Sequence, residues 1–265
     1  MLNFNHFTHK FKHKRLKLGI ALWMLVSLII TAALILPNAR PAEANARPLV
    51  LLYHHIDHKV SQWHVTPEKF EAQLKFLAQN GYHTISMETY MNAIQHNGAL
   101  PDKPIVITFD DGGADNFTYA LPLLQRYGMT ATFFIVSEWV GTKGFMTWNE
   151  VVALKQAGME IGAHTMHHPF LTHLPIWRQF LEIFIARLTI ELHIKSPVMF
   201  FAYPYNDHNK MTVTLTRFSG FWAALAVAPH KSDVSNDPLE IPRATVLSGE
   251  GMNTFMLVVR GGLVR

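Results

Sequence analysis

The chain has 265 residues, of which 49% are hydrophobic and 16% charged, with a formal net charge of +4 at pH 7 and no cysteine. The lack of cysteine excludes disulfides and thiolate metal sites, so any metal must be held by His, Asp, Glu and water. Residues 1–46 hold six of the 23 basic residues and one of the 19 acidic ones. The remainder is nearly neutral, and we expect no nucleic-acid-binding surface.

The first 46 residues have the pattern of a membrane-directing leader. Five basic residues between positions 10 and 17 precede residues 18–36, which contain no charge. A helix of that length, at about 1.5 Å per residue, nearly crosses the ~30 Å hydrocarbon core, which favours a retained anchor. Ala44 and Ala46 form an A-x-A pattern before Arg47, which favours cleavage there instead. Both alternatives place residues 47–265 outside the cytoplasm, secreted or anchored at the cell surface.

Beyond residue 48, short apolar runs alternate with amphipathic stretches, which is typical of successive strand–helix units. Seven strands and a candidate eighth are expected, at residues 49–53, 83–85, 105–109, 131–136, 160–163, 198–203, 221–227 and 243–247. This number of units predicts an α/β fold, a distorted (β/α)7-type barrel forming a single domain over residues 47–265 after the apolar N-terminal helix. Active residues are then expected at the C-terminal ends of the strands.

Three helices can be predicted from the sequence, two from the residues at their ends and one from its composition. The first begins at Thr66 and ends at Gly81, and the second begins at Thr147, which forms a capping box with Glu150. The third, at residues 177–194, is rich in Phe, Leu and Ile, and we expect it to be a buried helix. Its charged residues exclude a second membrane span.

Two carboxylates follow the predicted strand at residues 105–109, in the segment T-F-D-D-G-G. Successive side chains of a strand point to opposite faces, so Asp110 and Asp111 can enter one pocket only where the backbone bends. Gly112 and Gly113 permit such a bend. Taken alone, a segment of this kind is more often an acidic turn after a strand.

A histidine pair follows the predicted strand at residues 160–163, in the segment H-T-M-H-H. His164 and His168 are four residues apart, a spacing that brings both imidazoles to one side of a helical turn. The spacing alone is weak, because two other histidine pairs in the chain share it. The position at a strand end distinguishes this pair, while His167 is expected to point elsewhere.

These segments resemble the first two motifs of the polysaccharide deacetylase family, the NodB-like carbohydrate esterases of family 4. The resemblance extends over about residues 51–246 and includes Tyr53-His54 and F-A-Y-P-Y at 201–205, an arrangement similar to the branch that deacetylates poly-β-1,6-N-acetylglucosamine of biofilm matrix. It implies a metal-dependent hydrolase that removes N-acetyl groups from a cell-surface or extracellular polysaccharide. Peptidoglycan, chitin oligomers and acetylated xylan are the alternative substrates.

The resemblance also implies roles for individual residues. Asp111, His164 and His168 would bind one divalent ion, zinc in the first place with nickel or cobalt as alternatives. Asp110 would be the general base and His54 the acid, with His55 as its rival. The backbone N–H of Tyr205 would stabilise the oxyanion. Apart from the resemblance, the candidate substrate contacts are Trp63, Thr165, Pro204 and Tyr205, and Thr165 has a second expected role, which is to orient a ligand.

Two positions depart from the family pattern. Many members carry Arg where Ala202 stands and Gly where Asn206 stands, which leaves a different class in play: a surface glycan-binding protein whose catalytic site has decayed. Arg243 is a candidate for the missing cation beside Asp110. The implied partners are an N-acetylated polysaccharide and, if the leader is retained, the membrane; we expect a monomer.

Overall fold

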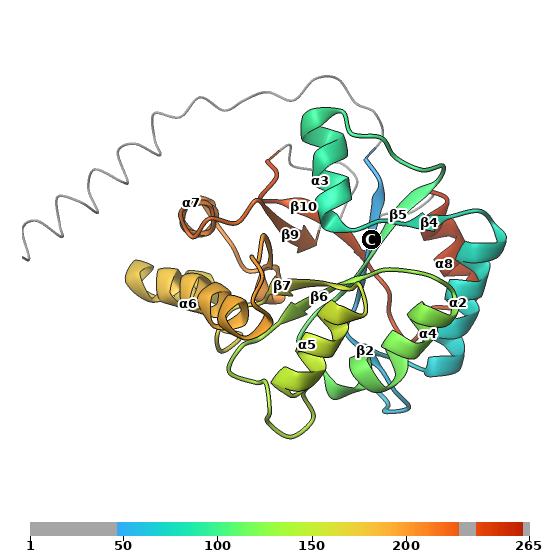
Figure 1. The fold of residues 1–265 in the computed structure, drawn as a ribbon, viewed down its shortest axis with the longest axis horizontal. Helices are drawn as coiled ribbons and strands as arrows, with labels where there is room; N and C mark the ends of the chain where they lie inside the picture. The colour runs from blue at the N-terminus through green and yellow to red at the C-terminus, as the bar shows by residue number, and fades with distance from the viewer. Residues whose placement is uncertain (1–46, 228–236, 262–265) are drawn as a thin grey trace, which may run out of the picture. The chain divides into compact units, whose positions relative to one another are not determined.

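Seven parallel strands close into a barrel in the computed structural model, which describes residues 47–227 and 237–261 (Figure 1). β1 pairs with both β5 and β10, which closes the ring. The ring consists of β1 (Leu49–Tyr53), β5 (Pro104–Phe109), β6 (Thr132–Ile135), β7 (Glu160–Ala163), β8 (Phe200–Ala202), β9 (Ala223–Val227) and β10 (Ile241–Thr245). The predicted (β/α)7-type barrel is therefore confirmed. The predicted N-terminal leader lies outside the described residues.

The structure exchanges the roles of two predicted strands. The candidate eighth strand is β10, a full member of the ring between β1 and β9. The strand expected at residues 83–85 is β4 (His83–Thr84), which pairs with the start of β5 outside the ring. β6 pairs with the other end of β5, so the seven-stranded ring closes without β4.

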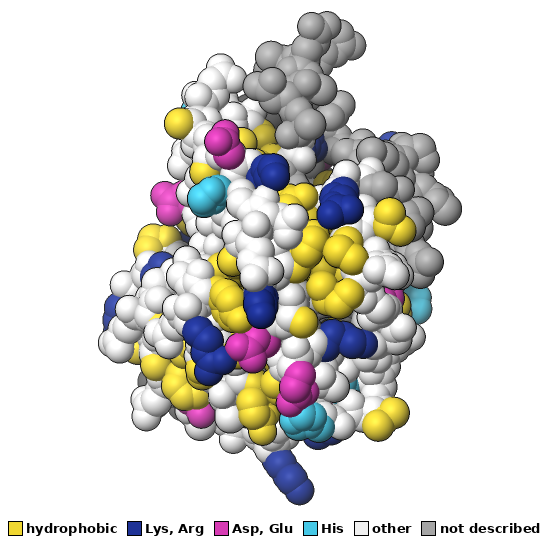
Figure 2. Space-filling view, turned by 90° about the vertical axis from the view of Figure 1, so that its right-hand side faces the viewer, with side chains coloured by type: hydrophobic (Ala, Val, Ile, Leu, Met, Phe, Trp, Pro, Cys, Tyr) yellow, Lys and Arg dark blue, Asp and Glu magenta, His cyan; other side chains and the backbone are white. Residues whose placement is uncertain are grey.

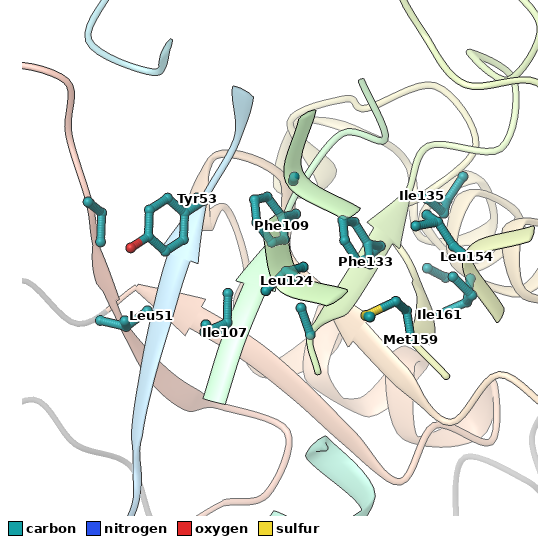
Figure 3. Packing of buried hydrophobic residues seen from close by; sticks show 14 of the residues in the cluster. Leu51, Tyr53, Ile107, Phe109, Leu124, Phe133, Ile135, Leu154, Met159 and Ile161 are labelled. Carbon is teal, nitrogen blue, oxygen red and sulfur yellow. The ribbon is translucent and has the colours of Figure 1, made fainter. Parts of the chain in front are cut away.

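Strand alternation divides the core into two layers. One layer lies between the barrel and its helices, and Figure 3 shows side chains of β1, β5 and β6 lined up in it. Phe109 and Phe133, from adjacent strands, stack there with ring centroids 4.8 Å apart. Burying such rings is the main apolar contribution to holding helices against the sheet.

The second layer fills the barrel itself. Val106, Phe134 and Leu225 belong to it, together with side chains of α3 (Met87–His96). Met87, the first residue of α3, donates its backbone N–H to the side chain of Glu160 at the start of β7, so α3 closes the amino-terminal end of the barrel. A Cβ on Gly162 would lie 2.5 Å from the Phe134 ring, so the narrow interior requires glycine there.

Two of the predicted helix starts are confirmed in detail. Thr66 caps α2 (Pro67–Gln79), and Thr147 and Glu150 form a capping box at α5 (Trp148–Gln156). The remaining elements are β2 (His55–Ile56), β3 (His64–Val65), η1 (Asn116–Ala120), α4 (Leu121–Arg126), η2 (Leu171–His173), α6 (Ile176–Ile194), η3 (Pro204–Asn206), α7 (Lys210–Phe218) and α8 (Met252–Val259). β2 and β3 form a separate two-stranded sheet.

The prediction of a buried helix over residues 177–194 is wrong for one side of α6. Glu182 and Ile183 face the protein interior, whereas Trp177 and Leu192 are 63% and 66% exposed. Apolar composition predicted burial, but the barrel offers this helix a single face for packing. Within residues 47–227 and 237–261, no helix combines the length and apolar character needed to cross a membrane.

Charged side chains are mixed on the surface. On the face shown in Figure 2, Lys and Arg side chains are dispersed among acidic and apolar ones. The described residues visible on this face therefore form no continuous basic tract of the kind that tracks phosphates.

Candidate metal centre

Three ligand-type side chains converge at the carboxyl ends of β5 and β7. The ligand atoms of Asp111, His164 and His168 all lie within 4.8 Å of one another. Asp111 Oδ1 is 3.3 Å from His168 Nε2 and 3.6 Å from His164 Nε2, and the two Nε2 atoms are 3.1 Å apart. Asp111 Oδ1 is buried and has no hydrogen-bond donor among the described residues. Two imidazole nitrogens around such a carboxylate oxygen suit a divalent cation.

The backbone bends sharply at these residues. Asp111 has φ 73 and Gly112 has φ 79, which is the bend expected for bringing both carboxylates into one pocket. Thr165 and His168 also have positive φ, at 68 and 58. Left-handed backbone at residues other than glycine is costly and persists where surrounding contacts enforce it.

Thr165 supplies one of those contacts. Its hydroxyl accepts from the backbone N–H of His168 and donates to the carbonyl of His164, so it ties the two ligand residues together. The side chain is fully buried. Of the two roles expected for Thr165, these contacts favour orienting a ligand over contact with substrate.

His164 is fixed from its far side by β8. Its Nδ1 donates to the carbonyl of Ala202 at 2.7 Å, which directs Nε2 toward Asp111. The side chain of Ala202 lies in the core layer inside the barrel. Asn206, the other departure, has φ 58, a conformation that asparagine tolerates better than most residues.

Asp110 lies beside the ligands but is held by another residue. Arg243 donates to Asp110 through both Nη atoms, at 2.7 and 2.8 Å, and both side chains are buried. Burial raises the pKa of Asp110, but the Arg243 guanidinium more than offsets this and holds that pKa well below its usual range. Burial and the neighbouring Asp110 carboxylate raise the pKa of Asp111 to about 7.

The two candidate acids after β1 have different surroundings. His54 lies against the Trp63 ring, with centroids 4.6 Å apart, and its Nδ1 has no hydrogen-bond partner among the described residues. Burial lowers the pKa of His54 to about 4, although Asp110 acts in the opposite direction. His55 bonds Asp115 at 2.9 Å. Burial lowers the pKa of His55, but the hydrogen bond and charge of Asp115 leave it raised overall.

Gly113 makes room for the His55–Asp115 pair. A Cβ there would lie 2.5 Å from Asp115 Oδ1 and 2.7 Å from His55 Nδ1. His55 also stacks on His64, with centroids 4.4 Å apart, and His64 bonds Asp57. The second glycine of the D-D-G-G segment therefore serves packing against the neighbouring loop.

The other predicted substrate contacts lie around the ligands. Trp63 is 40% exposed beside His54, and Tyr205 is 56% exposed with its ring centroid 4.5 Å from that of His168. Pro204 is buried. Tyr205 has φ 56, so the turn after β8 is as sharply bent as the ligand loops.

Three further residues around the site carry no local sequence signal. Asp115 bonds a partner 60 positions away, and the buried Glu182 accepts from both the backbone N–H and the ring Nδ1 of His167. Phe170 stacks on Tyr205, with centroids 4.0 Å apart. Asp115 and Phe170 follow β5 and β7 by a few residues, which is the sequence feature that could have pointed to them, whereas Glu182 lies within α6 and has no such feature.

Comparisons with known proteins point to polysaccharide deacetylases. The model of the family described as polysaccharide deacetylase matches residues 97–224. YxkH of Bacillus subtilis, whose name places it among polysaccharide deacetylases, is 27% identical over 213 residues, covering 80% of this chain and 76% of YxkH. The poly-beta-1,6-N-acetyl-D-glucosamine N-deacetylase of Escherichia coli is 23% identical over 207 residues, covering 66% of this chain but 31% of that protein.

A solved structure has the same fold. The Streptococcus pyogenes deacetylase PplD, determined in complex with acetate, superposes with a TM-score of 0.76 at 22% identity, covering 83% of this chain and 99% of PplD. At that level of identity the likeness concerns the fold alone.

Proposed function

We propose that this chain is a member of the polysaccharide deacetylase family, whose model matches residues 97–224, and that it uses one divalent metal ion to hydrolyse N-acetyl groups of an extracellular polysaccharide. The observation that carries the proposal is the convergence of Asp111, His164 and His168 within 4.8 Å beside the Arg243-bound Asp110. Zinc is the first candidate for these ligands, with nickel and cobalt as alternatives.

Asp111, His164 and His168 would hold the ion and leave coordination positions for water and substrate. A bound ion of this kind polarises a carbonyl oxygen and lowers the pKa of water from 15.7 toward ~7. Asp110, kept ionised by Arg243, would accept the proton of the attacking water. The backbone N–H of Tyr205 would donate to the developing oxyanion, an interaction worth about 3–4 kcal/mol.

His54 would protonate the leaving amine. With a pKa of about 4 it is neutral at pH 7 in the free protein, so it must receive a proton during turnover before it can donate one. His55 is the rival because its pKa is raised, but its Nδ1 is engaged by Asp115. The choice of His54 is supported by its unengaged ring nitrogen.

The substrate that we favour is poly-β-1,6-N-acetylglucosamine, the polymer named for the Escherichia coli relative. The chain spans about a third of that protein's length, so the shared activity is part of the proposal. Peptidoglycan, chitin oligomers and acetylated xylan would use the same ligands and differ in contacts along the polymer. The predicted leader supports an extracytoplasmic location, either secreted or membrane-anchored.

The alternative class, a glycan-binding protein with a decayed site, rests on the departures at Ala202 and Asn206. Both are accommodated: Arg243 supplies Asp110 with the cation that Ala202 lacks, and Asn206 adopts φ 58 and exchanges two hydrogen bonds with the backbone of Val227. We therefore favour the enzyme.

Acetate release tests the proposal. The purified protein is stripped with chelator, reconstituted with zinc, nickel or cobalt singly, and given poly-N-acetylglucosamine, peptidoglycan, chitin oligomers or acetylated xylan. We expect metal-dependent release of acetate, fastest from poly-N-acetylglucosamine. Lack of release from every glycan with every ion would refute the enzyme.

A further inference from the structure

An exposed aromatic pair lies next to the candidate metal centre. The rings of Phe170 and Tyr205 are nearly parallel, with centroids 4.0 Å apart and an interplanar angle of 12°. Tyr205 in turn meets the ring of His168 edge-on. Phe170 is 47% and Tyr205 56% exposed, whereas the core phenylalanines are fully buried. Adjacent apolar rings that remain in water beside a reactive site indicate a ligand-binding surface.

The pair is held in place by polar contacts between two turns that are distant in sequence. Asp207, after η3, accepts from both the backbone N–H and the hydroxyl of Thr172 in η2, at 2.8 and 2.6 Å. Asn206 exchanges two hydrogen bonds with the backbone of Val227 in β9. These contacts fix the rings before any ligand arrives, so little conformational entropy remains to be lost on binding.

The chemistry of the pair suits a sugar ring. A pyranose with equatorial substituents presents a flat face of C–H groups, which packs on exposed aromatic surface much as apolar side chains do. Tyr205 covers one face of Phe170, and His173 stacks near the same ring with centroids 5.4 Å apart, so a sugar would contact the parts of the pair that remain exposed. Tyr205 separates Phe170 from His168, so a sugar that contacts Phe170 lies beyond the one placed at the metal ligands. Trp63, on the His54 side, offers a second exposed ring.

We propose that Phe170 is a positioning residue that, together with Tyr205, binds a sugar unit adjacent to the unit being deacetylated. This inference rests on the proposed function and adds a preference for polymers over monomers. The Phe170–Tyr205 pair would lower KM for long substrates by placing the polysaccharide across the metal ligands. The hydrolytic step itself would depend on the other residues of the site.

The test uses the zinc-loaded full-length protein and its Phe170→Ala and Phe170→Tyr variants. The substrates are a β-1,6-linked N-acetylglucosamine pentamer and a small acetyl ester. Loss of the Phe170 ring should raise KM for the pentamer about fivefold to tenfold, with a much smaller effect on kcat and on the ester. Phe170→Tyr should restore KM. The matched control is Trp222→Ala, which removes a partly exposed ring packed against Phe200 in the layer at the α3 end, and it should leave KM unchanged.

Equal losses on pentamer and ester, or no loss on the pentamer, would overturn the inference. Calorimetric binding of the pentamer to metal-free protein separates it from the proposed function. If binding weakens about fivefold in Phe170→Ala but wild type releases no acetate, the sugar-binding role of Phe170 is supported and the proposed deacetylase activity is refuted. If wild type releases acetate and Phe170→Ala changes neither pentamer binding nor KM, the deacetylase activity is supported and the role of Phe170 is refuted.

Discussion

Arg243 holds Asp110 inside the barrel through two parallel hydrogen bonds of 2.7 and 2.8 Å, with 1% and 3% of the respective side chains exposed. Arg243 comes from β10 and Asp110 follows β5, so the pair joins two strands on either side of β1. A planar guanidinium suits a carboxylate in this way because both oxygens are satisfied at once. The pair therefore fixes the orientation of Asp110 as well as its charge.

Replacing Arg243 should move the pH dependence of activity. Arg243 holds the pKa of Asp110 down against the effect of burial, so Arg243→Ala should raise that pKa. The acid limb of kcat/KM would then shift to higher pH, since Asp110 must be ionised to accept a proton. The variant should also lose about 3–5 kcal/mol of unfolding free energy, because a buried charge loses its partner. Arg243→Lys keeps the positive charge but cannot form the two parallel hydrogen bonds. It should therefore shift the acid limb of the pH profile less than Arg243→Ala does.

An acid limb that stays in place in Arg243→Ala would contradict the role of Asp110 as base. The profile is measured as kcat/KM between pH 4 and 9, and stability by urea unfolding at pH 7. Activity is measured without urea and at a temperature at which each variant is folded. A change in the pH profile is then not confused with a loss of folded protein.

Metal should stabilise the protein through its three predicted ligands. A ligand that binds the native state alone adds about 2.7 kcal/mol at a hundredfold excess over Kd, which for a domain of this size raises Tm by roughly 5–10 °C. Chelator should remove this increment, and Asp111→Asn or His164→Ala should abolish it. Differential scanning fluorimetry with and without zinc measures the effect.

His167 provides the control for the metal prediction. It lies between the ligand residues in sequence, but its ring bonds Glu182, so His167→Ala should retain the zinc-dependent rise in Tm. A rise lost in His167→Ala but kept in His164→Ala would show that the wrong histidines had been assigned.

Separate variants distinguish the two candidate acids. If His54 is the acid, His54→Ala should lower kcat about 10²- to 10⁴-fold while the zinc-dependent rise in Tm persists. His55→Ala removes the partner of Asp115 and should cost about 1–3 kcal/mol of stability with a smaller loss of kcat. Turnover on acetylated glycan and urea unfolding are measured for both. The reverse pattern would assign the acid to His55.

Local sequence patterns were sufficient to predict most of the barrel. The predicted bounds of β1 and β7 agree with the structure, because each strand is followed directly by a histidine, His54 or His164, that ends its apolar residues. The capping box at Thr147 was readable for the same reason, since both partners lie within one helical turn. Strand bounds and helix caps were predictable because they depend on residues close together in the sequence.

Long-range contacts account for what the sequence did not reveal. The packing of α3 into the barrel depends on strands from across the whole chain, and the His55–Asp115 bond joins residues 60 positions apart. The composition of α6 could not show that one of its faces lacks a packing partner. Phe170 became notable only beside Tyr205, 35 positions further along the chain.

Gly113 should tolerate no side chain, even though its backbone conformation does not require glycine. The Cβ of Gly113→Ala would press on Asp115 and His55 at 2.5 and 2.7 Å, and Asp115 is also bonded to the backbone of Ile56, so neither partner can withdraw freely. We expect a loss of about 1–3 kcal/mol, typical of overpacking, with reduced activity as the loop carrying His54 shifts. Gly249→Ala, where an added Cβ meets nothing within 4 Å, is the matched control and should stay within about 0.5 kcal/mol of wild type. Urea unfolding measures both, and equal stability of the two variants would show that the His55–Asp115 pair yields without cost.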